Sequence, residues 1–156
     1  MTPDRLTLDT NLVREWWDQR PKQRVVAQLL DLADRGMVDL AVTATIHLDI
    51  PDEPLALRIQ ELPEIAIGKT ETVARLGSWL LGRDMLGSQE FVDWQEGLGV
   101  TEPDSRDFDH LHAHMLLRRD YFLTWDGAIL SLASELTRRW EIRVLRPEDY
   151  LSEKSP

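Results

Sequence analysis

The sequence predicts a three-layer α/β fold, in which a central, mostly parallel sheet lies between helices, within a single domain over residues 1–156. Two observations predict this class. Short β-prone runs alternate with stretches of helical periodicity, and strands that are separated by helical crossovers pair in parallel. The composition, with 42% hydrophobic and 29% charged residues, is typical of a globular chain with a substantial core.

The N-terminal part of the chain predicts the order β, α, α, β, α. Residues 5–9 (RLTLD) are β-rich and run into Asp-Thr-Asn, a sequence that opens helices. Apolar residues recur at helical spacing over residues 25–33, and Gly36 is the expected C-terminal cap. Residues 40–42 (LAV) predict a second strand, and residues 43–49 a helix that the next proline ends.

Prolines and glycines interrupt residues 51–103 too often for long elements. Within this region, residues 65–67 (IAI) predict a short strand and residues 90–96 a short helix. Residues 75–88 (RLGSWLLGRDMLGS) are interpreted either as a loop or as a broken helix. This middle region therefore contributes little to the predicted topology.

The C-terminal part returns to a regular alternation. Residues 104–119 carry apolar residues at helical spacing, and residues 121–124 (YFLT) form a β-prone run. Residues 126–139 predict a helix with two arginines in its last turn, and residues 142–145 predict a final strand. The alternation of helix and strand thus extends to the end of the chain.

The charge balance and the absence of cysteine exclude several functional classes. With 18 Lys and Arg against 28 Asp and Glu, the formal charge of −10 repels nucleic acid unless bound cations or a basic patch reverse it locally. Without cysteine there is no disulfide, thiolate zinc site or cysteine nucleophile. No stretch approaches the roughly 18 apolar residues of a membrane span. A cytoplasmic protein with no membrane partner is predicted.

Acidic residues follow the predicted strands, where the chemistry of a parallel sheet collects. Asp9 ends the first strand, and Asp126 comes two residues after Thr124 at the end of a later one. Asp49 lies in the helix after the second strand, and Asp107 in the first turn of the helix that precedes residues 121–124. Four carboxylates are therefore expected at one edge of the sheet.

Each carboxylate also has a purely structural explanation. Asp9 and Asp126 precede helices and are typical N-caps, while Asp107 complements the helix dipole. The joint pattern favours a common site, because clustered carboxylates raise one another's pKa unless a cation neutralises them. Oxygen ligands suit Mg²⁺ or Mn²⁺, and a pair of such ions activates water in phosphodiester cleavage.

Three histidines within five residues, His110, His112 and His114, invite a zinc interpretation. On a helix, however, His112 points away from the face that Asp107, His110 and His114 share. Hydrogen-bonded or exposed histidines are the simpler interpretation, although His110 is expected near the acids. Trp125, between Thr124 and Asp126, lies where a substrate base would reach it.

Three segments resemble the PIN-domain nucleases, a family that includes the toxin ribonucleases of bacterial VapC-type toxin–antitoxin pairs. They are residues 7–13 (TLDTNLV), 40–50 (LAVTATIHLDI) and, most specifically, 107–126 (DFDHLHAHMLLRRDYFLTWD). The C-terminal residues 143–151 (RVLRPEDYL) are also similar to the last strand of the family and its Pro-Glu turn. Residues 51–103 show no clear correspondence.

The resemblance implies a PIN-like fold in which Asp9, Asp107 and Asp126 bind the metal, with Asn11 and Thr124 supporting the site. The family usually has Glu at the position of Asp49, and the shorter side chain suggests contact with the metal through a water. Homodimers and complexes with an antitoxin protein are further implications of the resemblance.

The expected function is a divalent-metal-dependent ribonuclease, in which Asp9, Asp49, Asp107 and Asp126 hold Mg²⁺ or Mn²⁺ and a metal-activated water attacks the phosphodiester of RNA. The departure from the family at Asp49 motivates an alternative, a catalytically weak PIN-like module that binds RNA or a partner. A phosphatase of small phosphate esters is a third interpretation.

Overall fold

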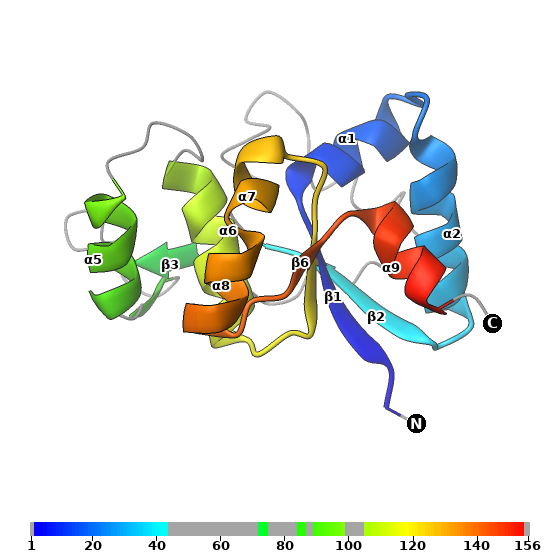
Figure 1. Cartoon of the computed structure of the whole chain (residues 1–156). Helices are drawn as coiled ribbons and strands as arrows, with labels where there is room; N and C mark the ends of the chain where they lie inside the picture. Colours follow the sequence, from blue (N-terminus) through cyan, green and yellow to red (C-terminus); the bar gives the residue numbers. More distant parts are fainter. Residues whose placement is uncertain (1, 44–71, 75–83, 87–88, 99–104, 155–156) are drawn as a thin grey trace.

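The computed structural model describes residues 2–43, 72–74, 84–86, 89–98 and 105–154. In these parts the chain is of the α/β class, with seven helices around a four-stranded parallel sheet and a second, two-stranded sheet (Figure 1). None of the helices in these parts is long and apolar enough to cross a membrane.

The main sheet has the strand order β2-β1-β5-β6 and is parallel throughout. Its strands are β1 (Asp4–Leu8), β2 (Val38–Val42), β5 (Tyr121–Leu123) and β6 (Val144–Leu145). The register pairs Leu8 with both Val42 and Leu123, and Leu123 with Leu145. The last residues of all four strands therefore lie in line at one edge, here called the carboxyl edge.

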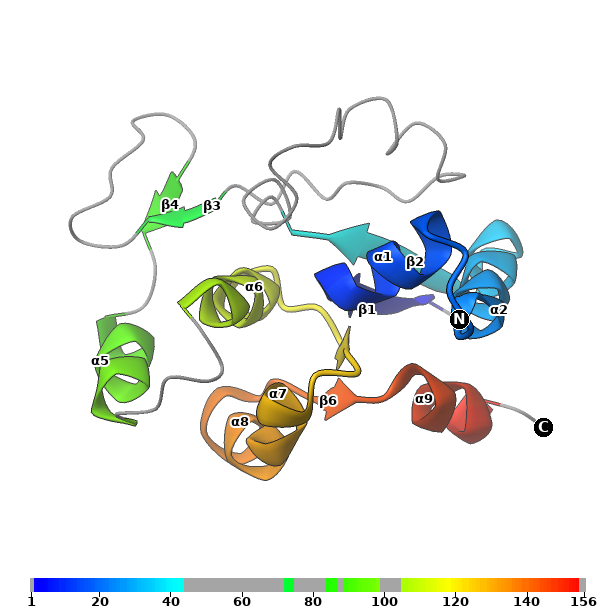
Figure 2. The same cartoon turned by 90° about the horizontal axis from the view of Figure 1, so that it is seen from above.

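Helices pack on both faces of this sheet (Figure 2). One face is covered by α1 (Thr10–Trp17), α2 (Gln23–Asp34) and α9 (Pro147–Lys154). The other face is covered by α6 (Ser105–Leu116), α7 (Gly127–Ser131) and α8 (Ala133–Trp140), and α5 (Gln89–Gly97) packs against α6 and α8 from outside (Figure 2).

The alternation of side chains along the strands divides the core into two clusters. Leu6, Leu8 and Leu123 pack with α1 and α2, whereas Phe122 and Val144 pack with the helices of the opposite face. Successive residues of a strand point to opposite faces, so a strand with apolar residues on both sides is buried between two helical layers.

The helix predicted over residues 126–139 is interrupted in the structure at Leu132, which is a correction. The Leu132 N–H bonds to the carbonyl of Ile129, three residues back instead of four, and this tighter turn separates α7 from α8. Ile129 and Leu136, one from each helix, are both fully buried in the same cluster. The predicted strand over residues 142–145 is confined to Val144–Leu145.

The middle region also departs from the sequence-based interpretation. A strand, β4 (Asp84–Leu86), lies within residues 75–88, where the sequence predicts a loop or a broken helix. It pairs in parallel with β3 (Thr72–Ala74), which no local pattern indicated. The helix expected at residues 90–96 is confirmed as α5. Apart from Thr43, the helix expected at residues 43–49 lies outside the described residues, as does the strand expected at 65–67.

Helix α9 was not predicted, although its sequence carries a start signal. Pro147 is the first residue of the helix, and Glu148 and Asp149 lie in its first turn. Proline is favoured at the first helical position, and acidic side chains there complement the helix dipole. Tyr150 then buries α9 against the sheet, with its ring 5.2 Å from that of Tyr121.

The turn after α1 provides a test of backbone strain. Gln19 has φ = 50°, a left-handed conformation that is unfavourable for a residue with a Cβ. The Gln19→Gly variant is therefore expected to raise the free energy of unfolding by about 0.5–1 kcal/mol. Urea denaturation measures this gain, and Gln19→Ala, which keeps a Cβ, is the control. Equal stability of the two variants would contradict the assignment of strain.

Candidate active site at the carboxyl edge of the sheet

Asp9 is a buried carboxylate at the end of β1, with only 4% of its surface exposed. Its backbone N–H bonds to the carbonyl of Leu123 at 3.0 Å, which fixes it to β5. Its Oδ1 accepts a hydrogen bond from the backbone N–H of Thr10 at 2.8 Å. Its Oδ2 accepts from the Thr124 hydroxyl at 2.6 Å and from the Asn11 amide at 2.9 Å. Two strands and α1 therefore hold one carboxylate in a single orientation.

Thr124 links Asp9 to Asp126. The Thr124 Oγ1 donates to Asp9 and accepts from the backbone N–H of Asp126 at 2.8 Å and from Asn11 Nδ2 at 3.1 Å. Asp126 caps α7, since its Oδ1 accepts from the backbone N–H groups of Ala128 and Ile129 at 2.7 and 3.0 Å. The expected N-cap roles of Asp9 and Asp126 are thus real, and both caps lie at the same edge of the sheet.

The environment of Asp9 makes its ionised form costly. Burial raises the pKa of the Asp9 carboxyl above its usual 3.8, and the negative charge of Asp126 also acts upward. A positive charge on His110 and the hydrogen bonds from Thr124 and Thr10 act in the opposite direction without cancelling the effect of burial. A nearby cation would therefore stabilise the carboxylate in the form that binds metal.

The raised pKa of Asp9 predicts a particular pH dependence of stability. The folded protein holds the Asp9 proton more tightly than the unfolded chain does. The protonated carboxyl therefore contributes fully to the free energy of unfolding below pH 3.8, and this contribution is lost as the pH rises through the folded-state pKa. Relative to Asp9→Asn, the metal-free wild type is expected to lose stability as the pH rises above 3.8. Urea denaturation of both proteins at a series of pH values measures the difference between their free energies of unfolding. A wild type that gains stability relative to Asp9→Asn as the pH rises would contradict a raised pKa of Asp9.

Helix α6 brings Asp107 to the carboxyl edge. The helix runs alongside β1, since His114 Nδ1 is 2.8 Å from Thr7 Oγ1 and His110 Nε2 is 3.4 Å from Thr10 Oγ1. Asp107 lies one turn before His110 in the same helix, on the face that His110 and His114 share, and is partly buried. Because His114 lies beside Thr7 and His110 beside Thr10, the preceding turn of α6, with Asp107, lies beyond the end of β1 on the side of the carboxyl edge.

The structure joins some of the predicted site residues more closely than others. Asp9, Asn11, Thr124 and the backbone of Asp126 form one hydrogen-bonded group. Asp49 lies outside the described residues. Within the described part of the chain, no three His, Asp or Glu side chains lie close enough together to hold a metal ion.

Two neighbours of this group were not among the residues predicted for the site. Thr10 and Thr43 both contact the buried ring of His110. The Thr10 hydroxyl lies against the Nε2 atom of the ring, and the Thr43 hydroxyl lies against its Nδ1 atom. Thr43 directly follows β2, so the rule that singled out Asp9 would also have found it. His112 turns away from this edge and stacks on Phe91, with ring centroids 4.6 Å apart, as the helical geometry predicts.

The indole of Trp125, which was expected where a substrate base would reach it, lies between the charged side chains of Glu148 and Lys22. Its indole N–H donates to both carboxylate oxygens of Glu148, at 2.7 and 3.0 Å. The ammonium group of Lys22 lies 4.7 Å from the ring centroid, a cation–π contact. Lys22 thereby places a positive charge beside the residue that links Thr124 to Asp126.

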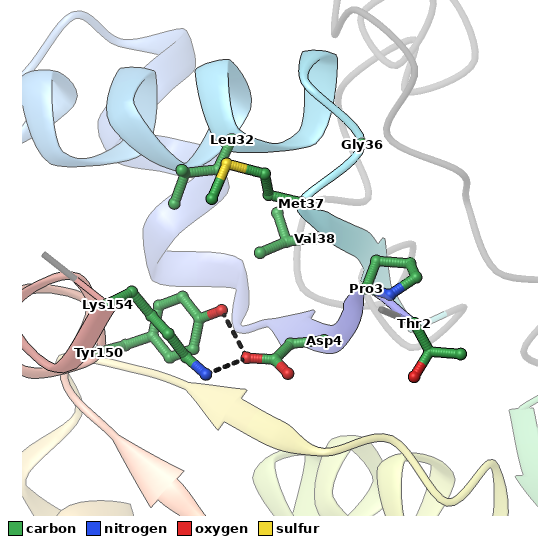
Figure 3. A pocket seen from close by; sticks show the side chains of 9 residues that line it. All are labelled: Thr2, Pro3, Asp4, Leu32, Gly36, Met37, Val38, Tyr150 and Lys154. Carbon is green, nitrogen blue, oxygen red and sulfur yellow. Dashed lines mark hydrogen bonds and ion pairs between the residues drawn. The ribbon is translucent and has the colours of Figure 1, made fainter. Parts of the chain in front are cut away.

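A pocket of about 420 Å³ lies at the opposite, amino edge of the sheet (Figure 3). There Asp4 Oδ2 accepts from the Tyr150 hydroxyl at 3.0 Å and pairs with Lys154 Nζ at 2.7 Å. Met37, which is 54% exposed, lies on the apolar side. This pocket is therefore separate from the group around Asp9.

No family model, curated protein or solved structure matches this chain. The assignment of a function therefore depends on the chemistry of the carboxyl edge itself. There, a buried carboxylate, an amide, a hydroxyl and a second carboxylate come from β1, α1 and the segment after β5.

Proposed function

We propose that the protein is a divalent-metal-dependent ribonuclease of PIN-like fold, with its active site at the carboxyl edge. The observation that carries the proposal is the buried carboxylate of Asp9, which Asn11 and Thr124 orient beside Asp126. A carboxylate that only caps a helix does not need burial at this depth or two further side-chain donors.

The donor set suits a hard cation. Asp9 and Asp126 offer carboxylate oxygens only, and Mg²⁺ is commonly bound by one or two carboxylates while it keeps several waters. Asp107 and Asp49 are the proposed further ligands or water-mediated contacts. When bound, such an ion supplies an activated water and stabilises charge on the phosphodiester. Thr124 and Asn11 orient Asp9, as residues around metal ligands generally do.

The substrate and partners belong to the same proposal. Lys22, beside Trp125, offers a positive charge near Asp126 that suits the RNA backbone, and bound cations reverse the negative charge of the site. The family resemblance supports a cytoplasmic toxin that forms homodimers and is neutralised by an antitoxin protein. A gene for a small partner beside the gene for this chain would favour that part of the proposal.

The second candidate function is a non-catalytic binding module of the same fold. It is favoured by the fact that Asp9 and Asp126 both cap helices, and that no three-residue metal group is present within the described residues. The two candidates differ in one measurable property, which is whether the folded protein binds a divalent cation at Asp9 and Asp126.

The test is a calorimetric titration of Mn²⁺ into the metal-free protein. The proposal expects binding by the wild type and loss of binding in both Asp9→Asn and Asp126→Asn. Asparagine is also a favoured N-cap, so both variants should keep their helices, as circular dichroism can verify. Asp34→Asn, at an exposed position of α2, is the matched control and should bind as the wild type does.

Absence of binding by the folded wild type would reject the metal-dependent ribonuclease and favour the binding module. Binding that survives both substitutions would place the cation elsewhere and would also reject the proposed site.

A further inference from the structure

The pocket at the amino edge of the sheet is lined by none of the residues that the proposed function uses (Figure 3). It lies where the end of α2 and the first residues of β1 and β2 meet α9. Asp4, at the start of β1, lines the pocket, whereas Asp9 follows the last residue of the same strand, roughly 16 Å away at about 3.3 Å per residue. The pocket has a volume of about 420 Å³, within the range of about 300–1,000 Å³ that is typical of sites for small organic molecules.

One side of this pocket is apolar. Leu32 comes from α2, Met37 from the turn after that helix and Val38 from the start of β2. Figure 3 shows these three side chains together, across the pocket from Tyr150 and Lys154. Met37 is 54% exposed, and it is the only large apolar side chain with such exposure in the described part of the chain. A flexible methionine beside a pocket can adapt its shape to an apolar ligand, and covering it removes apolar surface from water.

The other side carries a compact polar group. The Tyr150 hydroxyl donates to Asp4 Oδ2 at 3.0 Å, and Lys154 Nζ lies 2.7 Å from the same oxygen. An ammonium group has three N–H donors, so its contact with Asp4 leaves capacity for a further acceptor. The Lys154 side chain is 39% exposed, and a ligand can therefore reach its ammonium group. The polar side thus offers a hydrogen-bond donor to a ligand.

The two charges of this polar group cancel. The hydrogen bond to Asp4 raises the pKa of Lys154 above its usual 10.5, so the ammonium persists at neutral pH. Partial burial acts to raise the pKa of Asp4, but the hydrogen bonds from Lys154 and Tyr150 outweigh it and hold this pKa below 3.8. No other charged side chain is among the described residues that line the pocket. The net charge of the lining is therefore zero.

We propose that this pocket binds a small neutral molecule with an apolar body and one oxygen acceptor. The body packs against Leu32, Met37 and Val38, and the oxygen accepts a hydrogen bond from Lys154 Nζ. Asp4 would repel an anionic head group at this ammonium, and Lys154 would repel a cationic head group at the carboxylate. Aromatic alcohols are the simplest members of the expected class, because they join an apolar ring to an uncharged acceptor. The inference depends neither on a metal ion nor on RNA.

The test follows the methionine methyl signals of the full chain by ¹H–¹³C NMR, with the four methionines ¹³C-labelled. Met37→Leu assigns the Met37 signal, and Met115→Leu assigns that of Met115, which packs with the core cluster on the opposite face of the sheet. Benzyl alcohol, benzoate and benzylamine are titrated separately, because they share a ring and differ in the charge of the head group. Lys154→Met removes the donor, and Lys22→Met, at an exposed position that does not line the pocket, is the matched control.

The expected result for the wild type is a saturable shift of the Met37 signal with benzyl alcohol, in the millimolar range for a ligand of this size, while the Met115 signal stays in place. Binding should be about fivefold weaker in Lys154→Met and unchanged in Lys22→Met. Asp4→Asn leaves the positive charge of Lys154 unbalanced, so this variant should bind benzoate more tightly than benzyl alcohol.

Absence of a saturable Met37 shift with benzyl alcohol would overturn the proposal, as would tighter binding of benzoate or benzylamine by the wild type. Equal shifts of the Met37 and Met115 signals would also overturn it, because they would show binding that is not specific to this pocket. Equal affinity of Lys154→Met and the wild type would remove the proposed hydrogen bond. A preference of Asp4→Asn for benzyl alcohol over benzoate would reject the charge balance as the reason for a neutral ligand.

Discussion

The Asp9→Asn variant is expected to cleave RNA at least about 10³-fold more slowly than the wild type under the same Mg²⁺ or Mn²⁺ concentration. A catalytic metal contributes several kcal/mol of transition-state stabilisation, and about 1.4 kcal/mol corresponds to a factor of ten in rate. Asn at position 9 keeps the N-cap of α1 but removes the charge that Asn11 and Thr124 orient. The comparison of kcat/KM between the two proteins measures the effect.

The same substitution should leave the metal-free protein folded. Because burial raises the pKa of Asp9, the ionised carboxylate is unfavourable at neutral pH when no cation is present. The variant is thus expected to be at least as stable as the wild type, while activity is lost. RNA cleavage by Asp9→Asn at the wild-type rate would remove Asp9 from the mechanism, and a loss of folding would instead show that the carboxylate is structural.

The Phe91→Ala variant is expected to lose about 3–5 kcal/mol of unfolding free energy. Phe91, on α5, is fully buried and is the centre of an aromatic group. Its ring centroid lies 5.5 Å from that of Trp94, 5.3 Å from that of Trp140 and 4.6 Å from that of His112. Truncation leaves a cavity among rigid rings that cannot easily close.

Urea denaturation of Phe91→Ala and Phe91→Leu distinguishes burial from aromatic geometry. The leucine variant keeps most of the apolar volume and should lose clearly less stability than the alanine variant. A cost below about 1 kcal/mol for Phe91→Ala would show that α5 does not depend on this contact for its position.

The sequence alone predicted the α/β class and most of the elements of the main sheet. Hydrophobic periodicity, whether of period two or of helical period, is a local property of the sequence. It therefore predicts the type of an element whichever distant segments that element packs against. The proximity of Asp9 and Asp126 could be predicted for a related reason. In a parallel sheet, residues that follow the strands must meet at one edge, so Asp9, Thr124 and Asp126 came together although 115 residues separate the bonded pair Asp9 and Thr124.

The tertiary structure decided the features that depend on which distant segments meet. The contacts of His110 with Thr10 and Thr43 join helix α6 to the ends of two strands, at separations of 100 and 67 residues. The pairing of β3 with β4 and the break at Leu132 are likewise invisible in local periodicity. The choice of hydrogen-bond partners is also a property of the folded chain, because no sequence pattern shows that the indole N–H of Trp125 meets the carboxylate of Glu148.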